Sequence, residues 1–180
     1  MNVWIERLTP WSLALECARA TMGKHPTGKE PSHEWKVGAL TCEHSPIRTV
    51  MFAVHMQDIP TFVSVHFVRH KIGVEHFVKS QRSDRSASGA SRHDLPQDAS
   101  VDHVMVCNAA AILQMARFRL CGKASAETRA VMESIVGTLR SIGETELADL
   151  CVPRCVQMGG RCPELQGCGR APMILKKEEN

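Results

Sequence analysis

Basic and hydroxyl side chains gather in one short stretch of the sequence. Residues 69 to 92 hold six Lys and Arg residues against two acids, Glu75 and Asp84, whereas the whole chain carries a net charge of only +3. Guanidinium groups form bidentate, charge-assisted hydrogen bonds with phosphate, and the hydroxyl of Ser80, close to Arg82, adds a neutral donor. The stretch therefore suits a phosphate group, although a solvated basic loop has the same composition.

Asn108 and Arg119 lie in a segment, about residues 101–120, that we expect to form one long helix. Their separation makes about three helical turns, so both polar side chains would share one otherwise apolar stripe. A buried guanidinium is costly unless an anion or several carbonyl groups satisfy it. Arg119 therefore needs a partner, either a carboxylate, phosphate or carbonyl of a ligand, or an internal acid such as Glu127 or Glu133.

Four of the eight cysteines lie near the C-terminal end of the chain, among glycines and prolines. They are Cys151, Cys155, Cys162 and Cys168. Such a segment buries little apolar area, and a tetrahedral zinc site of four thiolates would give it order. The spacing lacks the paired C-x-x-C of a zinc ribbon, so free thiols or disulfides stay open, as does an iron–sulfur cluster.

Apolar periodicity and capping residues predict the elements that must position these side chains. Helices are expected over residues 9–22, 101–120 and 125–142, a strand over 49–56, and loops over 23–34 and 83–100. Residues 62–70 favour a helix, although alternation of apolar residues there also permits a strand. His55 and His76 are interpreted as packing or surface residues.

The composition limits the class of protein. The chain has 180 residues, of which 43% are hydrophobic and 23% charged, as in one ordinary globular domain. No apolar run approaches the ~20 residues of a membrane-spanning helix, and the first residues lack the pattern of an export signal. We therefore expect a soluble, cytoplasmic protein without a membrane partner, whose thiols are reduced or bind metal.

The basic stretch and the Asn–Arg pair together resemble a known family. His66-Phe67-Val68-Arg69-His70-Lys71 followed by Ser80-Gln81-Arg82 is similar to the signature of the flavin-dependent thymidylate synthases, which is Arg-His-Arg, a spacer, Ser and usually a further Arg. In that family an Asn that contacts flavin is followed by an essential Arg and then a Glu, and Asn108, Arg119 and Glu127 have the same spacing.

The resemblance covers about residues 10–145 and includes several departures. Lys71 stands where the signature has its second Arg, and the spacer before Ser80 is one residue longer than in the family. Ser83 replaces a common Tyr, and His66 replaces a usual Gln. These changes indicate a divergent branch of the family.

The resemblance implies an α/β (α+β) fold, with a mixed or antiparallel sheet packed by helices, over residues 1–150. A Cys-rich tail would follow over residues 151–180. It also implies a reductive methylation of dUMP to dTMP with FAD as cofactor and NADPH and methylenetetrahydrofolate as co-substrates. Reduced flavin would mediate transfer of the carbon and then supply a hydride, so that the protein needs no nucleophile of its own. The site would be shared between subunits of a homotetramer.

The same resemblance assigns roles to individual side chains. Arg119 would be catalytic, because it would hold the pyrimidine and stabilise the charge that develops on its carbonyl. The substrate-binding residues would be Ser80, Arg82, His66 and Arg69, the first two at the 5′-phosphate. The flavin-binding residues would be Arg69, His70, Lys71 and Asn108.

Two other functions fit parts of the sequence. One is a pyrimidine nucleotide hydroxymethylase of the same family. The other is a zinc-containing nucleic-acid-binding protein that uses the basic stretch on phosphates. Aromatic residues make up only 4% of the chain, which disfavours a base-stacking surface and makes nucleic acid an improbable partner. A purely structural oligomer would leave Asn108 and Arg119 unexplained.

Overall fold

Four antiparallel strands form one sheet in the order β1-β2-β4-β3. The computed structural model describes residues 1–85 and 91–173. The strands are β1 (Asn2–Arg7), β2 (Met51–Pro60), β3 (Val74–Val78) and β4 (Ser100–Asn108). In the central pair, Met51 of β2 lies opposite Asn108 of β4. The expected α/β (α+β) class, with an antiparallel sheet packed by helices, is confirmed.

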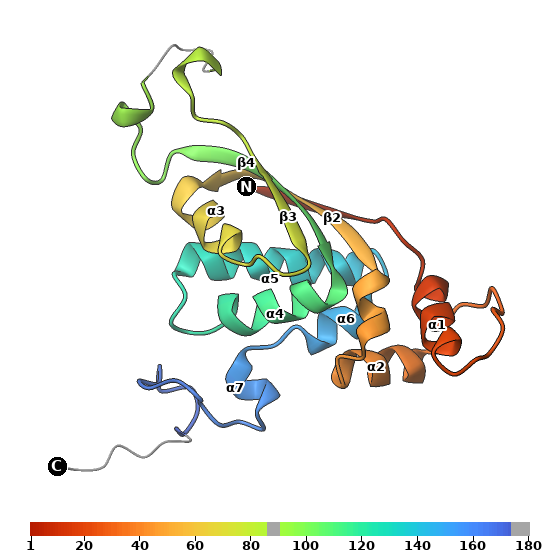
Figure 1. Ribbon diagram of the computed structural model, residues 1–180. Coiled ribbons are helices and arrows are strands. Elements are labelled where there is room, and N and C mark those ends of the chain that lie inside the picture. The colour runs from red at the N-terminus through yellow and green to blue at the C-terminus, as the bar shows by residue number, and fades with distance from the viewer. Residues whose placement is uncertain (86–90, 174–180) are drawn as a thin grey trace.

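Helices cover one face of this sheet (Figure 1), and α3, α4 and α5 contact its strands. The helices are α1 (Trp11–Ala20), α2 (His33–Thr41), α3 (Thr61–Val68), α4 (Ala109–Arg119), α5 (Ala126–Ser141), α6 (Thr145–Leu150) and α7 (Arg154–Gln157). Side chains cap several of them: Ser32, Asn108 and Ser125 each accept a backbone N–H of the first turn of α2, α4 and α5. None of the helices in the described part of the chain has the length and apolar character of a membrane span.

The core lies between the sheet and the helices. Every second side chain of β2, such as Phe52 and Val54, points into the core. The helices contribute Phe67 of α3, Met115 of α4 and Ile135 of α5 to the same cluster. All five side chains are at most 1% exposed. Burying a side chain of this size stabilises a fold by roughly 1.5–3 kcal/mol relative to leaving it in water.

A buried carboxylate joins the beginning of the chain to the turn between α5 and α6. Glu144 is 3% exposed and accepts hydrogen bonds from Arg7 Nη1 at 2.8 Å and from Trp11 Nε1 at 2.7 Å. Two donors, one of them charged, offset the cost of taking this carboxylate out of water. The contact holds β1 and α1 against the end of α5.

The face of the sheet away from the helices carries a row of apolar and aromatic side chains. Trp4, His55, Val104 and Phe77 are neighbours across the four strands. Trp4 stacks on His55 with 4.5 Å between ring centroids, and Phe77 is 60% exposed. We call this row the outer face.

Most of the expected elements are confirmed. The helices expected over 9–22, 62–70 and 125–142 correspond to α1, α3 and α5, and the strand over 49–56 corresponds to β2. The loop expected over 23–34 ends earlier, because α2 begins at His33. The loop expected over 83–100 holds two short 3-10 turns, Ser83–Arg85 and Arg92–Asp94, and its residues 86–90 lie outside the described part.

The long helix expected over residues 101–120 is wrong, because its first half is strand β4. Val101, His103, Met105 and Cys107 are buried in alternation, which is the period of a strand. This segment pairs with β2 on one side and with β3 on the other. The hydrogen bonds and side-chain packing of that pairing outweigh the segment's local preference for a helix. Asn108 consequently lies at the junction of β4 and α4 and does not share a helical stripe with Arg119.

Candidate functional site

Arg119, at the last turn of α4, reaches across to α3 and the segment after it. Its Nε donates a hydrogen bond to His70 Nε2 at 3.0 Å, and its Nη2 donates to the backbone oxygen of His66 at 2.5 Å. Both acceptors are neutral groups, whereas an internal acid was one expected partner. Within the described residues the remaining N–H groups of Arg119 have no partner. The guanidinium therefore keeps its charge and part of its hydrogen-bonding capacity for a ligand.

The histidines beside Arg119 are held neutral. Burial, followed by the charge of Arg119 and then that of His76, lowers the pKa of His70 to about 4. Burial and the charges of Arg119 and Arg69 lower the pKa of His66 in the same way. A neutral His70 that accepts from Arg119 through Nε2 must carry its proton on Nδ1. The pair is thus a fixed donor and acceptor at neutral pH.

A chain of hydrogen bonds supports His70 from within the sheet. Ser64 Oγ lies 3.1 Å from His103 Nδ1, His103 Nε2 lies 3.0 Å from His76 Nδ1, and His76 Nε2 donates to the backbone oxygen of His70 at 2.8 Å. The carbonyl can only accept, so His76 Nε2 carries a proton. Burial, followed by the charge of His76, lowers the pKa of His103 to about 4, so the His103 ring is uncharged at neutral pH.

Several cations and hydroxyls surround a hollow of about 250 Å³ between the end of β3 and the start of α3. We call it the basic hollow. It is lined by Thr61, Val78, Lys79, Ser80, Gln81, Arg82, Arg92 and Val101. Arg82 forms an ion pair with Asp84, whose carboxylate accepts hydrogen bonds from Arg82 Nε and Nη2 at 2.9 Å each. Both side chains are exposed. This arrangement suits a phosphate that competes with Asp84 for the guanidinium.

A second hollow, of about 350 Å³, adjoins the basic hollow at α3. Thr61 lines both, and His66 and Arg69 line the second one. His66 Nδ1 lies 2.8 Å from Thr128 Oγ1 of α5, which fixes the ring at the wall of the hollow. The two hollows together place Ser80, Arg82, His66 and Arg69 around α3.

Asn108 lines a separate hollow of about 380 Å³, which we call the Asn108 hollow. Its Oδ1 accepts from the backbone N–H of Ala111 at 2.9 Å, and a Cβ added to Gly73 would lie 2.5 Å from its Nδ2. Gly73, Ala110 and Ala111 leave a surface of small side chains, with the guanidinium of Arg48 at the edge. An amide, a cation and a lining of mostly small or apolar residues suit a heteroaromatic ring that carries phosphate.

The single chain therefore distributes the predicted site residues over several places. His66, His70 and Arg119 are brought together, and Ser80 and Arg82 share the basic hollow. Lys71 is exposed. Arg119 also lines a further hollow of about 180 Å³, together with Phe118, Cys121, Lys123, Ala124 and Glu164.

Four residues near these places were missed in the sequence. His76 and His103 meet only because β3 pairs with β4, and Lys79 and Arg92 meet Ser80 only through the folding of the loop. The surplus of charge over residues 69–92 was the one signal that pointed toward Lys79 and Arg92. Nothing in the spacing of the two histidines indicated their contact.

The predicted zinc ligands do not lie in one group. Cys155, Cys162 and Cys168 line one small cavity, whereas Cys151 is buried at the end of α6 and does not line it. Burial raises the pKa of Cys151 to about 12, which disfavours the thiolate that a metal requires. Over residues 1–85 and 91–173, no group of three or more His, Cys, Asp or Glu side chains could hold a metal ion as the side chains stand.

The fold is similar to that of solved flavin-dependent thymidylate synthases. Two structures of the Helicobacter pylori enzyme, both complexed with FAD and dUMP, superpose with a TM-score of 0.66. They are 13% and 14% identical in sequence, and the match covers 84% of this chain and 100% and 99% of theirs. No protein-family model matches this sequence, and no curated protein does either. The likeness is thus one of fold.

Proposed function

We propose that this protein is a flavin-dependent thymidylate synthase that converts dUMP to dTMP with FAD, NADPH and methylenetetrahydrofolate. The observation that carries the proposal is Arg119, a part-buried guanidinium held by two neutral acceptors, in a fold shared with enzymes solved with FAD and dUMP. The resemblance of residues 66–82 to the family's signature, and the separate spacing of Asn108 and Arg119, are further support.

Two N–H groups of Arg119 donate to His70 and His66. The pyrimidine would accept hydrogen bonds from the other N–H groups of the guanidinium. Burial and the charge of Arg69 lower its pKa, but a guanidinium stays charged at neutral pH. A fixed positive charge beside a uracil carbonyl stabilises the negative charge that develops there during attack at C5. Neutral His70 orients the guanidinium without neutralising it.

The 5′-phosphate of dUMP would occupy the basic hollow. Ser80 offers a hydroxyl, and Lys79, Arg82 and Arg92 offer charge around the same space. His66 and Arg69, in the adjoining hollow, would then lie along the sugar and base. Asp84 holds Arg82 in place when no phosphate is bound.

The Asn108 hollow, with its amide, small side chains and nearby guanidinium, fits a flavin. Asn108 and Arg48 would hold it there, and His70, Lys71 and Arg69 would contact it from the segment after α3. When bound, FAD would carry reducing equivalents from NADPH to the methylated pyrimidine. The chain's own residues orient the two ligands and exclude water.

Sharing of sites between subunits would bring these separate places together. One chain holds its candidate residues in hollows at different ends of α4, and the outer face leaves Phe77 60% exposed. We therefore infer a homotetramer in which residues from neighbouring subunits complete each site.

The first test is the visible absorption spectrum of the purified full chain after incubation with FAD and desalting, followed by titration with dUMP. Retained flavin whose spectrum shifts with dUMP would support one shared site and lead to assays of NADPH- and folate-dependent dTMP synthesis. Nucleotide turnover without stoichiometric oxidation of NADPH would instead indicate a hydroxymethylase. The absence of both flavin retention and a dUMP response would overturn the proposal, and salt-dependent binding of nucleic acid would then be measured.

A further inference from the structure

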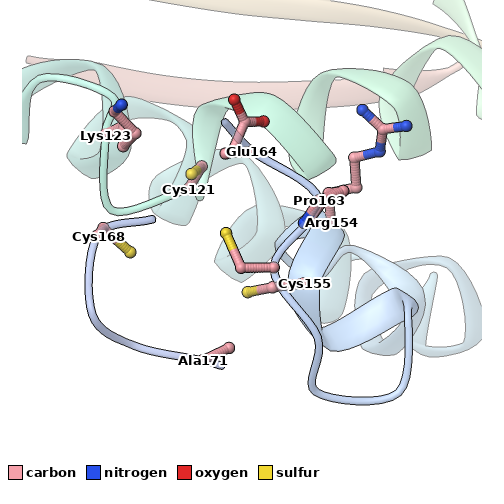
Figure 2. A pocket seen from close by; sticks show the side chains of 9 residues that line it. Cys121, Lys123, Arg154, Cys155, Pro163, Glu164, Cys168 and Ala171 are labelled. Carbon is pink, nitrogen blue, oxygen red and sulfur yellow. The ribbon is translucent and has the colours of Figure 1, made fainter. Parts of the chain in front are cut away.

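Four cysteines from two distant parts of the chain line one small cavity. Cys121 lies in the turn after α4, Cys155 on α7, and Cys162 and Cys168 in the segment that follows. Figure 2 shows the sulfur atoms of Cys121, Cys155 and Cys168 facing the same space. All four thiols are free. We call this space the thiol cavity; its volume is about 10 Å³, roughly that of one water-sized particle.

Glycines beside these cysteines let the two segments approach closely. A Cβ on Gly122, next to Cys121, would lie 3.0 Å from Cys168 Sγ, and one on Gly167 would lie 3.6 Å from Cys162 Sγ. Lys123 Nζ donates to the backbone oxygen of Gln166 at 3.0 Å, which ties the same turn to the same segment. The turn after α4 and the C-terminal segment are therefore held close together by these contacts.

The segment that supplies three of the thiols has almost no core of its own. Among its described residues, from Arg154 to Met173, Cys162 is the one buried side chain. A segment of this kind needs a source of order other than apolar burial. The isolated bridge between Cys162 and Met173 and the short helix α7 supply little of it.

The charges around the thiol cavity suit a metal held by thiolates. Four thiolates around one Zn²⁺ carry a net charge of −2. Lys123 and Arg154 line the cavity, and Arg170 Nε lies 3.5 Å from the Cβ position of Gly122. Glu164 also lines it and partly offsets these cations. The balance of these side chains is positive, which offsets the negative charge of a zinc ion held by four thiolates.

We propose that Cys121, Cys155, Cys162 and Cys168 bind one Zn²⁺, which fastens the C-terminal segment to the end of α4. The four thiols would lose their protons to solvent as four Zn–S bonds form. Rotation about the Cα–Cβ bonds, with a small inward movement of the segment, is required to close the tetrahedron. Cys121 thus replaces the buried Cys151 in the ligand set expected from sequence. The site is independent of the proposed enzymatic activity.

The test is the metal content of the full chain purified under reducing conditions, with Cys121→Ser and Cys168→Ser as ligand variants. Cys42→Ser, which alters an exposed thiol of the segment after α2, is the matched control, and Cys151→Ala tests the ligand set expected from sequence. We expect one zinc per chain in the wild type and in both control variants, and at least tenfold weaker binding in the ligand variants. Titration of the metal-free chain with Co²⁺ should give the visible bands of a tetrahedral thiolate site. Circular dichroism checks that each variant is folded.

Three outcomes would overturn the proposal. The first is a fully reduced wild-type chain that binds neither Zn²⁺ nor Co²⁺ stoichiometrically. The second is loss of metal in Cys151→Ala but not in Cys121→Ser. The third is iron with acid-labile sulfide, or disulfides among these four cysteines in the purified chain. FAD and dUMP binding, measured on the same samples, separates failure of this site from failure of the proposed function.

Discussion

The hydrogen bonds of Arg119 leave its charge uncompensated by any described acid. His70 and the carbonyl of His66 orient the side chain, but neither neutralises it. A part-buried cation of this kind is costly by itself and becomes favourable when an anion or a polarised carbonyl binds. The residue is therefore placed for a ligand rather than for stability.

Replacing Arg119 tests this placement. We expect Arg119→Ala to lower the rate of dTMP formation by about 10²–10³-fold, because a fixed charge at the developing negative charge is lost. Unfolding by urea should change little. Arg117→Ala is the matched control, since Arg117 lies on the same helix and pairs with Glu43 and Gln114. Normal turnover by Arg119→Ala would remove the assigned role.

The neutral histidines predict a dependence of stability on pH. His70 and His103 have pKa values of about 4 in the folded chain and an ordinary value of 6.5. Between these values the unfolded chain binds more protons, so the free energy of unfolding falls as the pH is lowered from about 6.5 toward 4. The contribution of buried His103 is about 3 kcal/mol, since a tenfold change in proton affinity corresponds to about 1.4 kcal/mol.

Urea unfolding at a series of pH values measures this loss. His103→Gln should flatten the dependence over the same range while lowering stability at neutral pH. A curve that stays flat from pH 7 to 4 in the wild type would contradict the neutral state of both rings.

Asp84 competes with phosphate for Arg82, because the two form a bidentate ion pair. Asp84→Asn should tighten dUMP binding by up to about fivefold and leave deoxyuridine binding unchanged, since an exposed ion pair is weak. Calorimetric titration measures both. Asp149→Asn, which breaks the distant exposed pair with Arg140, is the control.

The double variant Ser80→Ala with Arg82→Ala should weaken dUMP binding more than FAD binding. Equal weakening of both would place the phosphate elsewhere.

At the scale of elements, the junction of β4 and α4 depends on one close contact. Gly73 has φ +71° and packs against the amide of Asn108, which caps α4. Gly73→Ala should lower the free energy of unfolding by about 1–2 kcal/mol through its backbone conformation. The clash with Asn108 should add about 1–3 kcal/mol and disturb flavin binding.

Gly143→Ala is the control for the first effect, the cost of the backbone conformation. Gly143 has φ +85° and nothing within 4 Å of its Cβ position, so only the conformational cost applies. Urea unfolding and FAD titration of the two variants give the difference. Equal losses for both would mean that Asn108 moves aside without cost.

Elements with local signals were predictable from the sequence, and elements that depend on pairing were not. Ser125 and the apolar stripe of α5 indicate that helix by themselves. In β4, polar Asp102 and His103 interrupt the apolar residues, and only pairing with β2 and β3 decides between strand and helix. The short strands β1 and β3 were missed for the same reason. In the site, motif spacing pointed to His70 and Arg119, but not to contacts made across strands or to the place of Cys121.

At the scale of the whole molecule, the outer face predicts self-association. Phe77 is 60% exposed on a row of apolar and aromatic residues that an enzyme of four subunits would cover. Phe77→Lys should shift the chain to a smaller oligomer, seen by light scattering, and lower dTMP formation if sites are shared. The fold should persist, because exposed substitutions usually change stability by less than about 0.5 kcal/mol.

Met22→Lys is the control for the added charge, since Met22 is 59% exposed in the turn after α1. A monomeric wild type at micromolar concentration would contradict the inferred assembly. A large oligomer that Phe77→Lys leaves intact would place the interface on another surface.

The contact of Glu144 with Arg7 and Trp11 also has a consequence for synthesis of the protein on the ribosome. Domains emerge from the N-terminal side first, and Trp11, which is fully buried in the folded chain, leaves the ribosome long before Glu144 does. Strand β1 likewise waits for β2, its neighbour in the sheet. Residues 2–20 therefore lack their folded-state contacts with β2 and Glu144 until those residues have been synthesised.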